Sequence, residues 1–320
     1  MSDAAALCST LTAKLAGHNL PVIRQTSAKV IALLSSRNSD VETIADTIRR
    51  DQAFMARILN VANSAYYRRR GDKITTITRA ITTIGYATTR DIALAAEYVE
   101  FVHKRQATGV NLHRLLGKAF VAAHQARALG EATRLSDPET LFTSALLESL
   151  GEFALASYLP VTFKKIGDIA REHGLPYEDA HVRVTELTPH AITVLIATTY
   201  QLPADLILSV PDWDNISEWR PPDRRNAVVH IANACAANLF ATESAPLVDD
   251  FKIFMARATA ALDLSAPTIA ALLTEAFHKA LEFADTVKID RTCLALEKSP
   301  AHDTPRQDFI QNCTQSIQSA

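Results

Sequence analysis

Apolar residues recur at helical spacing along most of the chain, and the pattern is densest in residues 39–67. Ser39 and Glu42 are spaced as a capping box before the first apolar run of this stretch. Asp51 is placed to cap a second helix. We expect this helix to end near Asn63, because the Asn63 side chain competes for backbone hydrogen bonds. The pattern therefore predicts a helical hairpin.

Similar periodicity predicts helices on both sides of this hairpin, with prolines, glycines and capping residues between them. Thr75 or Thr76 should cap one helix that stops at Gly85, and Thr88 or Thr89 should cap the next. A further helix should start at Asp137 and continue through residue 151. Later helices are expected at 163–170, 177–187, 189–200, 203–210, 224–240, 251–262 and 268–283. Strand-like alternation never extends beyond a few residues, so we predict an all-α fold.

A short polar break at residues 106–110 predicts a hinge between two packed lobes. We expect the chain to divide into a lead-in helix at 1–19, a first lobe at 20–104, a second lobe at 111–240, a C-terminal helical extension at 241–297 and a flexible tail at 298–320.

Composition excludes several classes of protein. The chain has 33 basic and 35 acidic residues, a net charge of −2, so no global field favours nucleic acid or anionic lipid. Its 4 cysteines are far apart and form no CxxC pair, which argues against a zinc site or a disulfide framework. No apolar run reaches the roughly 18 residues that a membrane helix needs. The N-terminus also lacks the charge pattern of a signal peptide. We therefore expect a cytoplasmic protein with no membrane partner.

The sequence DQAFMARIL at 51–59, followed by NVANSAYY at 60–67, resembles the signature of the HDOD family, which is related to the HD metal phosphohydrolases. Leu20-Pro21 upstream and Ile84-Gly85 downstream extend the resemblance, which is strongest over 20–95 and continues to about 240. It implies an N-terminal helical bundle packed on an HD-like helical bundle. The signature residues that it marks as an interaction surface are Asp51, Asn60, Asn63, Ser64, Tyr66, Tyr67 and Gly85.

HD phosphohydrolases hold metal with a His, a His-Asp pair and a later Asp, which supply lone pairs to a divalent cation. The resemblance places these positions at Lys118, Glu148, Ser149 and Asn233. An ammonium has no lone pair, and Ser and Asn replace carboxylates poorly, so we predict that the metal site is degenerate and that the chain holds no metal or other cofactor. The cleft at this position should include His190 and His230, with Trp213 and Asp214 where some relatives carry paired histidines.

Three functions compete. The resemblance favours a non-catalytic signal-transduction or regulatory protein that contacts separate signalling proteins, since no receiver, GGDEF or EAL pattern is attached. The enzyme alternative is a divergent phosphohydrolase that uses Glu148, His230 and a neighbour such as Asp212 or Asp214. A third hypothesis, binding of nucleotide or nucleic acid, rests on the basic run Arg68, Arg69, Arg70 and Lys73. The near-neutral total charge favours a solvated connection there and argues against a nucleic-acid partner.

Overall fold

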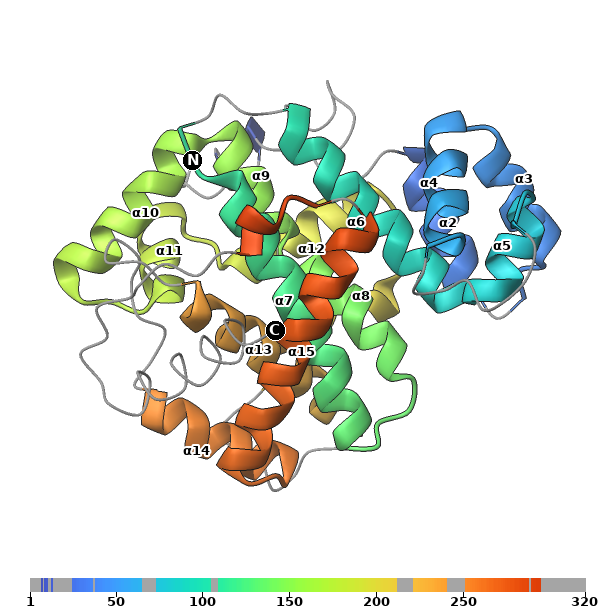
Figure 1. The fold of residues 1–320 in the computed structure, drawn as a ribbon. Coiled ribbons are helices and arrows are strands. Elements are labelled where there is room, and N and C mark those ends of the chain that lie inside the picture. Colours follow the sequence, from blue (N-terminus) through green and yellow to red (C-terminus); the bar gives the residue numbers. More distant parts are fainter. Residues whose placement is uncertain are drawn as a thin grey trace.

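The computed structural model describes residues 25–36, 38–64, 73–104, 109–211, 221–240, 251–287 and 289–294, together with residues 7, 9, 10 and 13. Every regular element in this part of the chain is a helix, which confirms the predicted all-α class. A small first lobe, at the right of Figure 1, joins a larger group of helices through the long helix α6. Buried side chains of both groups form one continuous apolar core.

The first lobe packs its helices through fully buried apolar side chains such as Ile48, Phe54 and Ile81. Helix α2 lies against α6, whereas α5 contacts both α3 and α4. The bounds are Gln25–Ser35 for α2, Val41–Arg49 for α3, Gln52–Ala62 for α4, Ile77–Ile84 for α5 and Tyr86–Lys104 for α6.

Capping in the hairpin differs from the prediction at one of its two helix starts. Asp40, not Ser39, caps α3, because its Oδ1 accepts hydrogen bonds of 2.9 Å from the backbone N–H groups of both Glu42 and Thr43. The carboxylate can accept two first-turn bonds and carries a charge that suits the helix N-terminus. Asp51 caps α4 as predicted. The predicted capping box was therefore wrong by one residue.

The next two helices are separated by a single glycine. Thr76 caps α5 as predicted, and Gly85 ends it with a positive φ of 84°, a conformation that glycine adopts without strain. Helix α6 then starts at Tyr86, so the predicted caps Thr88 and Thr89 were wrong. Thr89 lies inside the helix, where its hydroxyl donates to the carbonyl of Gly85 at 2.7 Å.

The second lobe is built on the long helix α7, which packs closely with α8 and α13. The single helix predicted from Asp137 is divided, because α8 ends at Glu148 and α9 begins at Leu150. The helix predicted at 203–210 is also wrong: only one 3₁₀ turn forms between Pro203 and Pro211. The bounds are Leu112–Ala132 for α7, Pro138–Glu148 for α8, Leu150–Tyr158 for α9, Pro160–His173 for α10, Tyr177–Thr185 for α11, Pro189–Thr199 for α12, Ala204–Leu206 for η1 and Pro221–Leu239 for α13.

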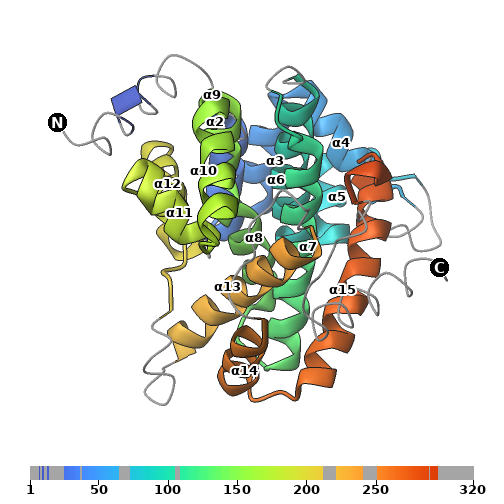
Figure 2. The same cartoon turned by 90° about the vertical axis from the view of Figure 1, so that its left-hand side faces the viewer.

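The C-terminal helices are α14 (Phe251–Leu262), α15 (Ala266–Val287) and the 3₁₀ turn η3 (Arg291–Leu294). Helix α15 runs along α7 and also reaches α4 and α6 (Figures 1 and 2). Its Phe283 packs edge-on against Phe142 and His124, with ring centroids 5.9 and 5.3 Å apart. The extension therefore contacts both lobes and adds to the common core.

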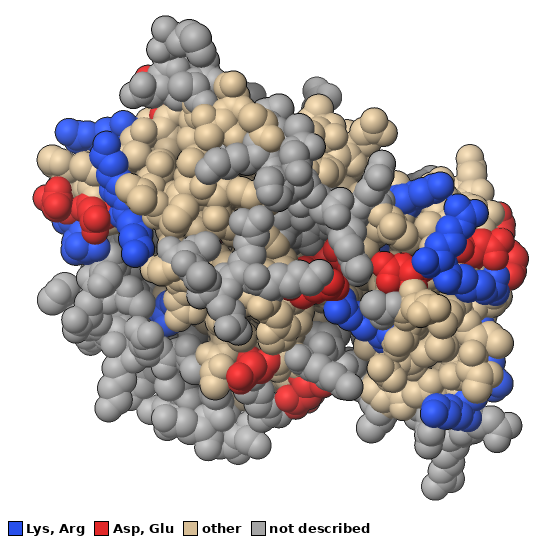
Figure 3. All heavy atoms as spheres, turned by 90° about the horizontal axis from the view of Figure 1, so that it is seen from above, with Lys and Arg blue, Asp and Glu red and all other residues tan. Residues whose placement is uncertain are grey.

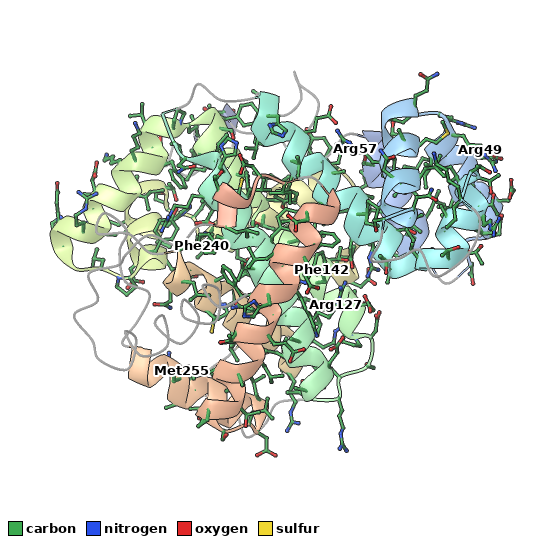
Figure 4. The ribbon with its side chains drawn as sticks, in the orientation of Figure 1. Arg49, Arg57, Arg127, Phe142, Phe240 and Met255 are labelled. Atoms are coloured by element: carbon green, nitrogen blue, oxygen red, sulfur yellow. The ribbon has the colours of Figure 1, made fainter. Side chains whose placement is uncertain are left out.

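Charged and polar side chains also join the lobes. We call this group the interlobe polar cluster; Arg90, Asp91 and Thr143 are buried in it, and Arg127 and Glu139 are partly exposed. The Thr143 hydroxyl donates to Asp91 at 2.8 Å and accepts from Arg90 Nε at 2.9 Å. Arg127 forms ion pairs with both Asp91 and Glu139. Its guanidinium lies 4.5 Å from the centre of the Phe142 ring on α8 (Figure 4). Burial raises the pKa of Asp91, and the two arginines oppose that rise.

Among the helices described, none alone is long and apolar enough to cross a bilayer. In the described part of the chain, one joined pair, α14 and α15, passes the test of length and composition, and these two helices are bent by 92° relative to each other.

Candidate functional site

A cavity of about 270 Å³ opens where α8 meets α9. Helices α7, α8, α9, α11, α12 and α13 all contribute to its wall. The structure thereby brings together the four predicted degenerate metal positions and two of the cleft candidates, His190 and His230. The four metal positions are Lys118, Glu148, Ser149 and Asn233.

The α8–α9 junction is held close to α12 by a glycine and a threonine. The backbone N–H of Gly151 donates to Thr193 Oγ1 at 3.0 Å, and Thr193 donates in turn to the carbonyl of Glu148 at 2.9 Å. A Cβ atom on Gly151 would lie 2.5 Å from the carbonyl oxygen of Pro189, so only glycine permits this approach. This contact places Glu148 beside the first turn of α12.

Glu148 is hydrogen-bonded to His190, the second residue of α12. Nδ1 of His190 lies 2.8 Å from Oε1 of Glu148, and both side chains are largely buried. The bond to the Glu148 carboxylate raises the pKa of His190, against a smaller opposing effect of burial. The pair therefore links the end of α8 to α12. The bond uses Nδ1 of His190 and Oε1 of Glu148, which are then not available as metal ligands.

Lys118 on α7 forms an ion pair with Glu152 on α9. Both side chains are largely buried, with 17% and 15% of their surfaces exposed. The ammonium therefore lies in the cavity wall and is neutralised by a carboxylate of the neighbouring helix.

The remaining predicted positions in the wall are Asn233, Ser149 and His230. The Asn233 amide nitrogen donates to the carbonyl of Val229 at 3.0 Å, which leaves the side-chain oxygen available to the cavity. Ser149 ends α8 and begins α9, and it makes no side-chain capping bond to α9. His230 lines the same wall one turn before Asn233.

Several lining residues were missed by sequence reasoning: Glu152, Tyr177, Glu178, Asp179, Ser209 and Asn226. Glu152 could have been suspected, because it is an acid four residues after Glu148. Nothing in the sequence distinguishes Tyr177, whose hydroxyl is buried without a hydrogen-bond partner. Burial raises the pKa of Tyr177 well above its usual value, and the nearby Glu152 charge adds to the effect.

The donors in this wall do not fit a divalent metal centre. Glu148 and His190 are bonded to each other, Glu152 is paired with Lys118, and Ser149 and Asn233 replace carboxylates. Across the described ranges, no three side chains of His, Cys, Asp or Glu form a group that could hold a metal ion. A cavity wall that contains an ammonium also repels a cation at the position where HD enzymes need one.

The described signature residues of the first lobe do not line this cavity, and Asn63 has a clear structural role. Asn63 donates to the carbonyl of Ile74 at 2.7 Å and accepts from its N–H at 2.8 Å, so it ties the end of α4 to the start of α5. Ser64 is half-buried, whereas Asn60 and Lys73 are exposed. On the face shown in Figure 3, acidic and basic side chains of this lobe lie side by side. One ion pair of the lobe joins Arg49 to Glu42 at 2.9 Å.

Some predicted residues lie outside the part of the chain that the structure describes. They are the signature tyrosines Tyr66 and Tyr67, the basic residues Arg68, Arg69 and Arg70, and the cleft candidates Trp213 and Asp214 with the neighbouring Asp212.

Solved structures with the same fold come from several bacteria. An HDOD domain protein of unknown function from Geobacter sulfurreducens has a TM-score of 0.63 at 16% identity, over 88% of this chain and 97% of that one. A "putative phosphohydrolase" from Shewanella amazonensis SB2B has a TM-score of 0.59 at 21% identity, over 89% and 98%. A "putative signal transduction protein" from Marinobacter aquaeolei VT8 has a TM-score of 0.59 at 14% identity, over 86% and 60%.

At these identities the likeness establishes the fold, and it assigns no activity. No curated protein matches the chain. The HDOD domain family matches residues 20–214, which is more than half of the chain and includes both the hairpin signature and the α8–α9 junction. The chain therefore belongs to the HDOD domain family.

Proposed function

We propose that this protein is a non-hydrolytic regulatory protein that acts in signal transduction by contacting separate signalling proteins. The observation that carries the proposal is the Lys118–Glu152 ion pair, which stands in the wall where the HD resemblance expects a metal-binding histidine. An ammonium offers no lone pair, and its charge opposes a divalent cation. The scaffold then acts through its shape and surface.

The donor chemistry favours this function over hydrolysis. Metal-assisted phosphate ester hydrolysis needs a cation that activates water and stabilises developing charge. Glu148 and His190 could each supply one ligand in principle, but they satisfy each other at 2.8 Å. One structural neighbour carries the name of a phosphohydrolase and another that of a signal transduction protein, and the side chains of this cavity fit the second role better.

A reconstruction experiment tests the proposal. The full chain should be expressed with added Mn²⁺ or Fe²⁺, and its metal content and its hydrolysis of a phosphodiester probe should be measured beside a variant that carries Lys118→His, Glu148→His, Ser149→Asp and Asn233→Asp. We expect little metal and no hydrolysis in the wild type, and a several-fold gain of bound metal in the variant. Lys118→Met alone, which removes the charge without adding a ligand, is the matched control.

Metal binding together with hydrolysis in the wild-type protein would contradict the proposal. Stoichiometric metal in the wild-type protein, with hydrolysis that Glu148→Ala abolishes, would show that the chain is a divergent enzyme. If hydrolysis is absent, affinity capture of the full chain from its native cell should identify the signalling protein that it contacts.

A further inference from the structure

The charged side chains in the cavity wall are engaged in two pairs. Lys118 forms an ion pair with Glu152, and His190 is hydrogen-bonded to Glu148 at 2.8 Å. All four side chains are largely buried, with 15–24% of their surfaces exposed. A cation would have to compete with Lys118 for a carboxylate, and an anion would have to compete with a carboxylate for Lys118. Either competition leaves a largely buried charge without its partner, so the wall favours a ligand without net charge.

Both pairs keep hydrogen-bonding capacity that a neutral ligand can use. An ammonium has three N–H donors, and the pair with Glu152 uses only part of this capacity on Lys118. A carboxylate accepts several hydrogen bonds, so Glu148 has acceptor sites beyond its bond to His190. One wall therefore offers donors and acceptors together, and a ligand can bond to them without separating either pair.

Two neutral side chains add to the same wall. The amide nitrogen of Asn233 is used by the carbonyl of Val229 at 3.0 Å, so the side-chain oxygen is an acceptor for a group in the cavity. The hydroxyl of Ser149 belongs to a residue that lines the cavity and makes no capping bond to α9. An alcohol group both donates and accepts, whereas an ammonium only donates and a carboxylate only accepts. Alcohol groups therefore match this mixture of donors and acceptors best.

Apolar side chains and the size of the cavity limit the ligand further. Pro176, Pro189 and Leu208 also line the cavity and provide a surface for C–H groups. The volume of about 270 Å³ lies just below the range of roughly 300–1,000 Å³ that is typical of ligand sites. The ligand is therefore a small molecule that combines a carbon chain with several hydroxyl groups.

We propose that this cavity binds a small neutral polyol, held by Ser149, Asn233 and the remaining donors and acceptors of the two charged pairs. The inference rests on the proposed function, since it requires a cavity that is not committed to a metal ion. Glu178 and Asp179 also line the cavity, but both are exposed, so water screens their charges and they do not set the charge of the ligand.

Three probes with the same carbon chain test the charge requirement. D-Sorbitol, D-glucamine and D-gluconate differ only at C1, which carries a hydroxyl, an ammonium or a carboxylate, and each should be titrated into the full chain by calorimetry and ¹H–¹⁵N NMR. We expect sorbitol to bind at least about tenfold more tightly than either charged analogue, because the analogues compete with the ion pairs. No saturable binding of sorbitol, or binding of a charged analogue as tight as that of sorbitol, would overturn the inference.

A fourth probe tests the need for several hydroxyl groups. 1,6-Hexanediol keeps the chain length and the two terminal hydroxyls of sorbitol, and we expect it to bind more weakly by at least about fivefold, the effect of one lost hydrogen bond. Saturation distinguishes a site from a general solvent effect, because polyols are otherwise excluded from protein surfaces. Binding of 1,6-hexanediol as tight as that of sorbitol would contradict a polyol site.

Two variants, each with a matched control, test the residues. Ser149→Ala and Asn233→Ala should each weaken sorbitol binding about fivefold. Asn238→Ala is the control on α13: the amide nitrogen of Asn238 also donates to the carbonyl four residues earlier, at 2.9 Å, but the residue does not line the cavity. Ser144→Ala, on α8 and likewise outside the lining, is the control for the hydroxyl. Both controls should leave binding unchanged, and unchanged binding in Ser149→Ala or Asn233→Ala would overturn the proposal as stated.

The two proposals fail in different ways. Absence of saturable sorbitol binding, with neither metal nor hydrolysis in the wild type, rejects the ligand and leaves the regulatory function in place. Stoichiometric metal with hydrolysis rejects the regulatory function whatever the probes do.

Discussion

The interlobe polar cluster and the cavity both include charged side chains of α7 and α8, but these charges join different parts of the molecule. In the cluster, two arginines face two carboxylates, and Asp91 has both of its oxygens engaged, by Thr143 and Arg127. In the cavity, Lys118 pairs with Glu152 and Glu148 bonds to His190, whereas the buried Tyr177 hydroxyl has no hydrogen-bond partner. The cluster therefore joins the two lobes, whereas the cavity pairs join helices of the second lobe to one another.

The largest effect is expected from breaking the balanced cluster. Asp91→Ala removes the carboxylate that faces Arg127 and Arg90 and leaves two cations buried or half-buried without it. We expect a loss of about 3–5 kcal/mol in the free energy of unfolding, the usual cost of removing one partner of a buried pair. Denaturant titration followed by circular dichroism measures it.

Asp46→Ala is the matched control, because Asp46 pairs with Arg49 on the exposed side of α3. Its effect should stay within about 0.5 kcal/mol. If Asp91→Ala lowered the free energy of unfolding no more than this control, the cluster would contribute no more to stability than an exposed ion pair does.

A smaller effect is expected in the cavity. Lys118→Met keeps the aliphatic length but leaves Glu152 without its cation. Water or a dissolved cation can enter the cavity and solvate Glu152, so we expect a loss of only about 1–2 kcal/mol in the free energy of unfolding. Lys279→Met, at an exposed pair with Glu275, should cost less than about 0.5 kcal/mol and serves as the control. A loss for Lys118→Met as large as that for Asp91→Ala would show that water is excluded from the cavity pair as fully as from the cluster.

Sequence patterns predicted local features of the fold well and the partners within these two sites poorly. Asp51, Thr76 and Gly85 were placed correctly because caps and stops depend on residues within one helical turn. The pairing of Asp91 with Thr143 joins residues 52 positions apart, and no local pattern encodes it. Only the packing of α6 against α8 brings the two together.

The cavity shows the same limit. The family resemblance identified Lys118, Glu148, Ser149 and Asn233 as equivalent positions, and the structure places all four in one wall. It gave no indication of Tyr177, because the position of α11 beside the cavity depends on its packing against α10, which no local pattern encodes. The division of the predicted helix at Ser149 was also missed, since both halves are strongly apolar.

The smallest expected effect concerns pH and the bond between His190 and Glu148. The bond raises the pKa of His190 above its ordinary value of 6.5, so its stabilising contribution is complete below that value and is lost as the pH rises through the higher pKa of the folded protein. The difference in unfolding free energy between wild type and His190→Gln should therefore be larger at roughly pH 6 than at roughly pH 9. The unfolding free energy of Glu148→Gln should also fall less between these two pH values than that of the wild type. His173→Gln, at an exposed position on α10, is the control and should show the pH dependence of the wild type. A difference that does not vary with pH would mean that His190 stays neutral and that only its hydrogen bond, and no charge on the imidazole, joins α8 to α12.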